Sequence, residues 1–173
     1  VSGKFNNQSI ELNKNEIKSL IKKKLLGLDI QQIKFSSQNN FGFKIDKNFK
    51  FRNFNIISQI ELENLRLKNS SNLKNIFPKI KKEILFKNQK IKLKYEKDIL
   101  SIIGKGEALL QNEIDKIEYE ILKRKNIFQL DTTFNISSNP FKLDLLNYQK
   151  NEKSVLELNL KVKQVNKNEL IFD

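Results

Sequence analysis

The sequence predicts a mainly β protein with a minor α component, built around an antiparallel meander sheet. Apolar and polar residues alternate along three runs, at residues 90–95, 117–121 and 156–162. Successive side chains of a strand point to opposite faces, so each run predicts a strand with one apolar and one polar face. Short turn-like segments separate the runs, and short connections favour antiparallel neighbours. We expect the sheet to curve into a half-pipe or groove, or to pack in a sandwich-like manner, together with two short helices.

Six strands are predicted in the C-terminal part of the chain, where the alternation is clearest. Polar segments rich in Asn, Lys, Glu and Ser mark the turns that bound them. These turns are predicted at 88–89, 96–98, 111–113, 123–126, 137–140 and 149–153. Four further strands are predicted upstream, at 30–35, 41–45, 49–57 and 59–67.

One short helix is predicted before each group of strands. In the first, over residues 15–28, Asn15 can cap the N-terminus and Gly27 can end the helix. Its lysines lie opposite its apolar stripe, so it either packs by that stripe or lies on a membrane surface; the short stripe without aromatic residues favours packing. The second helix is predicted within residues 72–85. Its regular part is expected to start near Asn75, which leaves Pro78 in the first turn, where a missing N–H costs little.

The predicted elements divide the chain into two units of similar plan. Residues 1–70 contain a helix and a partial meander unit, and residues 71–173 contain a short helix and the six-strand meander. The chain begins with Val1 rather than Met, so we interpret it as a fragment of a longer repeat protein.

The strong positive charge has a simple interpretation. The 173 residues carry a net charge of +13, and 30 of the 33 basic residues are lysine. These lysines alternate with apolar residues along predicted strands, as expected for the solvated side of a sheet. Arginine, which binds phosphate through two parallel hydrogen bonds, is nearly absent. We therefore expect no nucleic-acid partner.

Catalysis is not expected, because the usual reactive residues are missing. The chain contains no His and no Cys, which removes the commonest general bases, thiolate nucleophiles and zinc ligands. Two carboxylate pairs, Glu61 with Glu63 and Glu118 with Glu120, lie on the polar sides of predicted strands and are expected to face solvent. We expect a protein that is not an enzyme, with no catalytic residues, no metal site and no cofactor.

A strip of small residues interrupts the apolar face of one predicted strand. Gly104, Gly106 and Ala108 share that face, with bulky residues on either side of them. The Gly104-Lys105-Gly106 segment lacks the further glycines and the strand-to-helix context of a phosphate loop. Glycine within a strand indicates a bend or the close approach of another group. The strip is therefore either packed against the second predicted helix or the floor of a trough in which a ligand chain lies.

The apolar face of the predicted sheet is the main candidate for a functional surface. Six strands at about 4.8 Å spacing make a sheet roughly 25 Å wide, which two short helices cannot cover. A second sheet, another segment of the same protein or a lipid must therefore cover it. The candidate lining residues are Ile91, Leu93, Tyr95, Leu100, Ile102, Gly104, Gly106, Ala108, Leu110, Ile117, Tyr119, Ile121, Leu130, Phe134, Leu143, Leu145, Leu156, Leu158, Leu160 and Val162.

The region from residue 73 to residue 110 resembles the AsmA-like proteins of Gram-negative envelopes, of the YhdP and TamB type. The resemblance is carried by a helical segment, the alternating run Lys90-Ile91-Lys92-Leu93-Lys94-Tyr95, and a strand with the phrase Ile102-Ile103-Gly104-Lys105-Gly106. It extends as a pattern over residues 41–173 and includes no diagnostic catalytic or ligand residue.

The resemblance implies a segment of a bridge-like lipid transport protein with a repeating β-groove. Such a protein carries phospholipid acyl chains along a hydrophobic groove between the inner and outer membranes. The implied location is the periplasm, with adjacent repeats of the same chain as neighbours and an inner-membrane anchor through an N-terminal helix that this sequence lacks. The alternatives are a structural or protein-binding β-sandwich domain and a lipopolysaccharide-carrying β-jelly roll.

Overall fold

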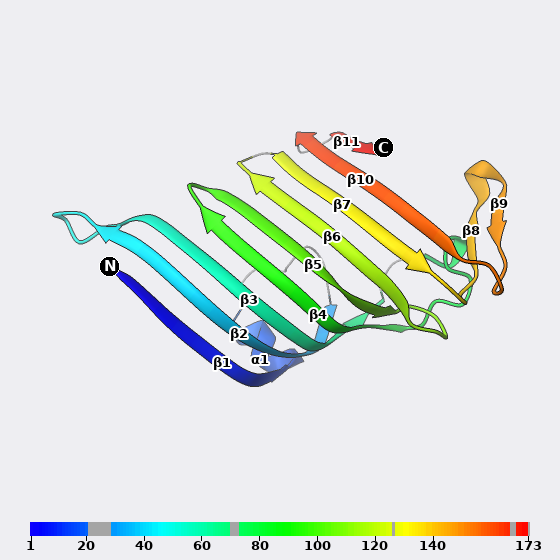
Figure 1. Cartoon of the computed structure of the whole chain (residues 1–173), viewed down its shortest axis with the longest axis horizontal. Coiled ribbons are helices and arrows are strands. Elements are labelled where there is room, and N and C mark those ends of the chain that lie inside the picture. Colours follow the sequence, from blue (N-terminus) through cyan, green and yellow to red (C-terminus); the bar gives the residue numbers. More distant parts are fainter. Residues whose placement is uncertain (21–28, 70–72, 126, 167–168, 173) are drawn as a thin grey trace.

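A long antiparallel sheet dominates the structure (Figure 1). The computed structural model describes residues 1–20, 29–69, 73–125, 127–166 and 169–172. Its strands are β1 (Ser2–Asn13), β2 (Asp29–Ile45), β3 (Phe51–Lys68), β4 (Glu83–Glu96), β5 (Ile99–Leu109), β6 (Asp115–Arg124), β7 (Ile127–Ile136), β8 (Phe141–Leu143), β9 (Tyr148–Lys150), β10 (Leu156–Asn166) and β11 (Glu169–Phe172). The helical elements are α1 (Lys14–Leu20) and two 3-10 turns, η1 (Leu73–Asn75) and η2 (Asp144–Leu146).

Nine strands form one open sheet in the order β1-β2-β3-β4-β5-β6-β7-β10-β11. Every neighbouring pair is antiparallel, and only the connection from β7 to β10 leaves the sheet to form another pair of strands. The predicted antiparallel meander and mainly β fold class are therefore confirmed. The expected boundary between residues 70 and 71 falls in the connection from β3 to β4, which are paired strands of the same sheet.

The N-terminal part of the sheet differs from the prediction of four short strands. The segments predicted separately merge into two long strands, β2 and β3, and the preceding segment forms β1, for which the sequence pattern predicts no strand. The polar stretch Ser36–Asn40 resembles a loop by composition. In the structure it pairs on both sides, with β1 and with β3. Pairing with two neighbours outweighs the low β-propensity of such residues.

The first predicted helix is present in part. Asn13, rather than Asn15, caps α1: its side-chain oxygen accepts hydrogen bonds from the backbone N–H groups of Asn15 and Glu16. The Glu16 carboxylate accepts a bond from the backbone N–H of Asn13, which completes a reciprocal cap. The remainder of the predicted helix, including Gly27, lies outside the described residues.

The second predicted helix is wrong. Only the single turn η1 forms, and β4 already begins at Glu83. Pro78 cannot donate a backbone hydrogen bond, and the chain around it folds as turns instead. The predicted turn at 88–89 is also wrong: both residues lie within β4, where Asn88 has a left-handed φ of 51° and the register with β5 shifts as in a bulge.

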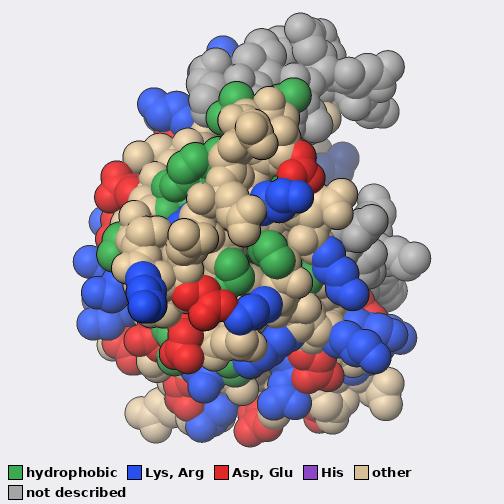
Figure 2. All heavy atoms as spheres, turned by 90° about the vertical axis from the view of Figure 1, so that its right-hand side faces the viewer, with side chains coloured by type: hydrophobic (Ala, Val, Ile, Leu, Met, Phe, Trp, Pro, Cys, Tyr) green, Lys and Arg blue, Asp and Glu red, His purple; other side chains and the backbone are tan. Residues whose placement is uncertain are grey.

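The buried apolar core is small and lies at one end of the sheet. Ala108, Phe134, Ile136 and Phe141 form its centre, so β5 and β7 meet the start of the β8–β9 hairpin there. Phe77, from the segment after η1, places its ring edge-on to the rings of Phe134 and Phe141, with centroids 6.0 and 5.7 Å apart. Seen from this end, apolar side chains form small groups among charged ones (Figure 2).

A buried polar cluster fixes the connections beside this core. It consists of Gln111, Asp115, Asn139 and Lys150. Lys150 is 2% exposed, and its ammonium donates to three backbone carbonyl oxygens, those of Ser137 (2.9 Å), Asn139 (2.8 Å) and Asn151 (3.0 Å). All three donor sites of the ammonium are thereby used, which offsets the cost of burying its charge.

The other members of the polar cluster link the neighbouring turns. The Asn139 amide donates to the Asp115 carboxylate at 2.6 Å, and its oxygen accepts from the backbone N–H of Glu113. The Gln111 side chain accepts from the backbone N–H of Lys79 and donates to the carbonyl of Pro140. The segment after η1, the β5–β6 turn and the β7–β8 turn are therefore held together by hydrogen bonds rather than by apolar contacts alone.

Replacing Lys150 with Met is expected to lower the free energy of unfolding by about 3 kcal/mol, because it leaves three buried carbonyl oxygens and a buried carboxylate without their cation. The exposed Lys153→Met variant is the matched control. Urea denaturation of both variants measures the difference. Equal stability of the two variants would contradict the structural role assigned to the polar cluster.

Candidate functional site: two faces of one sheet

Cross-strand register places most of the predicted lining residues on one face of the sheet. Ile91 lies opposite Gly104, Gly104 lies opposite Tyr119, and the same pattern continues to β10. We call this surface the apolar face. Its predicted members are Ile91, Leu93, Tyr95, Leu100, Ile102, Gly104, Gly106, Ala108, Ile117, Tyr119, Ile121, Leu130, Phe134, Leu156, Leu158, Leu160 and Val162.

Three predicted lining residues do not belong to the sheet. Leu110 follows the end of β5 and packs against the buried core, as does Leu143 in the β8–β9 hairpin. Leu145 is 91% exposed at the tip of that hairpin. The predicted strand fails here because the 3-10 turn η2 reverses the chain after three residues and ends at Asn147, whose φ of 49° is left-handed. The segment therefore forms a separate two-stranded sheet.

The strip of small residues is occupied by the protein itself, not by space for a ligand. The Tyr119 ring lies over Gly104, so that a Cβ on Gly104 would come within 2.2 Å of the ring. Gln89 lies against Gly106 in the same way, and Ala108 is completely buried in the core. Burial also raises the pKa of Tyr119. The trough expected along this strip is therefore absent, and the close approach comes from neighbouring strands rather than from a helix.

The rest of the apolar face is half-buried. Leu93, Ile102, Ile121 and Leu130 are each partly exposed, and they lie side by side on neighbouring strands. Within the described part of the chain, the only other sheet is the β8–β9 pair at one end, so no second layer of sheet covers this face. A sandwich core would require such a layer.

Polar residues on the same face were not anticipated from the alternation. Ser37, Asn39 and Ser58 continue the apolar face onto β2 and β3, and all three are buried. The Asn39 amide donates to the Ser37 hydroxyl at 2.9 Å and to the backbone carbonyl of Phe5 at 3.2 Å. These three residues form a polar patch within the face, because the register places Ile56 and Ile60 of β3 and Phe41 of β2 on the same face beside them. Only the register of β2, in a stretch that resembles a loop, reveals this.

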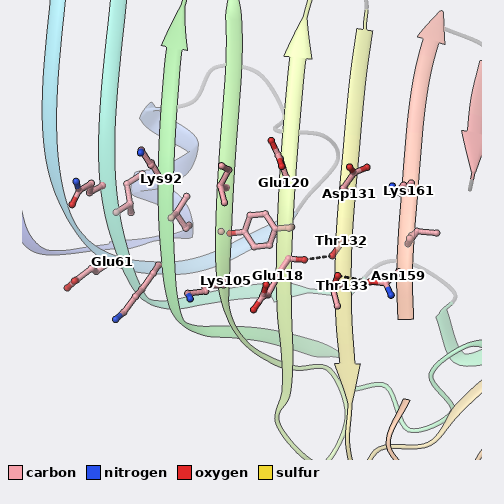
Figure 3. Close-up of a pocket in the computed structure, with 18 residues that line it drawn as sticks. Glu61, Lys92, Lys105, Glu118, Glu120, Asp131, Thr132, Thr133, Asn159 and Lys161 are labelled. Atoms are coloured by element: carbon pink, nitrogen blue, oxygen red, sulfur yellow. Dashed lines mark hydrogen bonds between the residues drawn. The ribbon is translucent and has the colours of Figure 1, made fainter. Parts of the chain in front are cut away.

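A groove of about 700 Å³ crosses six strands, β3 to β7 and β10 (Figure 3). Each strand contributes three consecutive residues, and register aligns them in three rows across the sheet. The two outer rows are Gln59, Lys92, Ile103, Glu120, Asp131 and Lys161, and Glu61, Lys90, Lys105, Glu118, Thr133 and Asn159. The middle row is Ile60, Ile91, Gly104, Tyr119, Thr132 and Leu160.

This groove opens on the polar face. The outer rows alternate with the middle row, so their side chains point away from the apolar face. If the groove opened on the apolar face, residues two positions from the middle row, such as Leu93, Ile102 and Ile121, would form its walls. None of these three residues lines the groove. The middle row therefore supplies backbone to the floor, and charged side chains form the two rims.

The rims of the groove carry balanced charge, with four lysines and four carboxylates. The Thr133 hydroxyl donates to Asn159 at 2.7 Å, and the Thr132 hydroxyl donates to the Glu118 carbonyl at 2.9 Å (Figure 3). In the parts of the chain that the structure describes, no group of three or more acidic, His or Cys side chains could hold a metal ion. All eight charged side chains of the rims are exposed.

Asp115 is the buried carboxyl group whose ionisation the fold alters. Burial raises its pKa, and this effect outweighs the lowering by hydrogen bonds from the Asn139 amide and the Ser137 backbone and by the charge of Lys150. Its place in the polar cluster, away from both rims of the groove, makes it a structural group.

Comparison with family models, with curated proteins and with solved structures found no match for this chain. None of the helices in the described residues is both long and apolar enough to span a bilayer. The site must therefore be interpreted from its own geometry.

Gly104→Ala is expected to destabilise the fold by roughly 1–3 kcal/mol, because the new Cβ displaces the Tyr119 ring. The same substitution in a Tyr119→Ala background should cost much less, since the obstructing ring is gone. A double-mutant cycle by urea denaturation measures the coupling between the two positions. Additive effects would show that the ring does not occupy the strip.

The raised pKa of Asp115 gives stability a defined pH dependence. Its contribution is fully present below the ordinary pKa of 3.8 and is lost as pH rises through the elevated folded-state pKa. The Tm of the wild-type chain should therefore fall relative to that of Asp115→Asn as pH increases from about 4 to about 7. Thermal melts across that range test this, and a difference that shifts in the opposite direction would rule it out.

Proposed function

We propose that the apolar face, opposite the groove, binds the acyl chains of lipids, and that the chain is a segment of a bridge-like lipid transport protein. The observation that carries this proposal is one open sheet whose aliphatic side chains form a continuous half-buried face from β4 to β10. A water-exposed apolar surface of this extent is costly, so an apolar occupant is expected.

Acyl chains suit this face because it offers area without directional contacts. Over Leu93, Ile102, Ile121 and Leu130 the neighbouring side chains are aliphatic, and burial there contributes about 25 cal/mol per Å². A surface of this kind holds methylene chains with little preference for position, so a lipid can shift along it without chemistry or a cofactor. The hydroxyl and amide groups of Ser37, Asn39 and Ser58 interrupt the apolar face on β2 and β3 with a buried polar patch.

The resemblance to AsmA-like envelope proteins supports the same proposal. It would place the segment among adjacent repeats that carry phospholipid between two membranes. The buried core takes up one end of this face, where Ile117, Leu156 and Leu158 pack against it, so the acyl chains are assigned to the part beyond it.

Two adjacent isoleucines on β5 provide a sharp test. Ile102 belongs to the apolar face, whereas Ile103 points to the polar face, is 50% exposed and lines the groove. A photocrosslinking residue at position 102 is expected to label phospholipid in cells, and the same residue at position 103 is expected to label little. The two variants differ only in the face that they probe.

Mass spectrometry of the crosslinked species identifies what is bound. Labelling of lipid from position 103 but not from position 102 would assign binding to the groove and reject the apolar face. Labelling of protein alone from position 102 would favour a structural, protein-binding role.

A further inference from the structure

The β2–β3 hairpin ends in a tip that combines exposed aromatic side chains with basic ones. In the described chain, pairing of this hairpin to β1 ends at Gly42 and pairing to β4 ends at Ile56, so the hairpin extends beyond its neighbours (Figure 1). We define the basic aromatic tip as residues 43–54. Its exposed apolar residues are Ile45 (47%), Phe49 (87%), Phe51 (70%) and Phe54 (46%).

Basic residues are interleaved with these aromatic side chains. The tip contains Lys44, Lys47, Lys50 and Arg52 and a single acidic residue, Asp46, which gives it a net charge of +3. Arg52 is paired with Asp46 at 3.1 Å. Among the described residues, no salt bridge involves the three lysines. Their charge is therefore available to an external anion.

Hydrogen bonds to Asp46 give the tip a defined shape. One carboxylate oxygen accepts from the backbone N–H groups of Asn48 (2.9 Å) and Lys50 (3.0 Å), and the other accepts from Arg52. Phe49 has a left-handed φ of 58°, and Phe51 packs edge-on against Phe43 with ring centroids 5.0 Å apart. Exposure of Phe49 and Phe51 is therefore built into an ordered turn.

We propose that the basic aromatic tip docks on the surface of an anionic lipid bilayer, with Phe49 and Phe51 inserted among the headgroups and the lysines at the level of the phosphates. Aromatic and apolar side chains at a protruding end insert into the interface, and flanking lysines are attracted to anionic lipids. The proposal goes beyond acyl-chain binding by the apolar face and does not depend on it.

Charge and shape favour a bilayer over the other possible partners. The tip is a two-stranded hairpin that extends beyond the neighbouring strands, a shape that can reach a bilayer surface (Figure 1). Recognition of nucleic acid relies on arginine and on aromatic platforms that stack successive bases. The tip carries one arginine, Arg52, and it is already paired with Asp46. The tip of the β8–β9 hairpin provides the contrast: Leu145 and Leu146 are 91% and 70% exposed, but Asp144 stands beside them instead of a cluster of lysines.

The absence of Trp from the chain allows a direct test. A single Trp is placed in the full chain by Phe49→Trp, or by Leu145→Trp as the matched control, and vesicles of equal parts phosphatidylcholine and phosphatidylglycerol are added. The emission of Phe49→Trp is expected to shift to the blue and to be quenched by brominated lipid, whereas that of Leu145→Trp stays unchanged. An unshifted Phe49→Trp spectrum, or an equal shift of both, would overturn the proposal.

Vesicle co-sedimentation measures the contribution of each group. Phe49→Ser combined with Phe51→Ser is expected to lower the partition coefficient by at least about tenfold, and Leu145→Ser combined with Leu146→Ser should leave it unchanged. Changing Lys44, Lys47 and Lys50 to Gln should lower it by about fivefold per lysine at low salt. Thermal melts confirm that the variants are folded. Undiminished sedimentation of the Phe49 and Phe51 variant, or binding to single-stranded RNA in preference to vesicles, would reject membrane docking.

The two proposals have separate readouts. Vesicle co-sedimentation of the Phe49→Ser and Phe51→Ser variant tests the tip, and phospholipid labelling from position 102 tests the apolar face. Labelling from position 102 that is absent while wild-type vesicle binding depends on Phe49 and Phe51 would reject the acyl-chain proposal and support docking by the tip. Vesicle binding that is retained without Phe49 and Phe51 would overturn the docking proposal.

Discussion

The two-residue period of the strands is the constraint on which the rest of the structure depends. Because side chains alternate between faces, the paired strands from β4 to β10 separate aliphatic residues such as Leu93, Ile102 and Ile121 from charged ones. A slip of one residue at any pairing would move aliphatic groups such as Leu93 and Ile102 to the charged side. The register shifts at Ser9 in β1 and at Asn88 in β4, both of which have a left-handed φ.

Burial is concentrated at one end of this sheet. The aromatic contacts of Phe77 and the hydrogen bonds of the buried polar cluster hold three connections together there, while the aliphatic face beyond them remains half-buried. A structure with so much of its apolar pattern outside a closed core differs from an ordinary sandwich. The proposed acyl chains and adjacent repeats would cover this surface. Docking of the tip would position the protein at a membrane.

The sequence determines some features of this protein more visibly than others. Alternation from Lys90 to Val162 is strong enough to predict the central strands and the face of nearly every candidate residue, because local pattern and tertiary pairing agree there. The polar stretch of β2 and the strand β1 could not be predicted, because their pairing partners, rather than their own propensities, make them strands. The same holds for the Tyr119 ring over Gly104, the polar cluster around Lys150 and the groove on the polar face, which exist only once distant strands are aligned.

The central claim is that lipid contacts the apolar face, and isoleucine methyl NMR measures this most directly. The chain can be labelled at its isoleucine methyl groups and titrated with a phospholipid that carries a spin label on its acyl chain. Broadening of the signals of Ile91, Ile102 and Ile121 on the apolar face, with sharp signals from Ile57 and Ile103 on the polar face, is the predicted result. Broadening confined to Ile57 and Ile103, or no broadening of either set, would contradict the account.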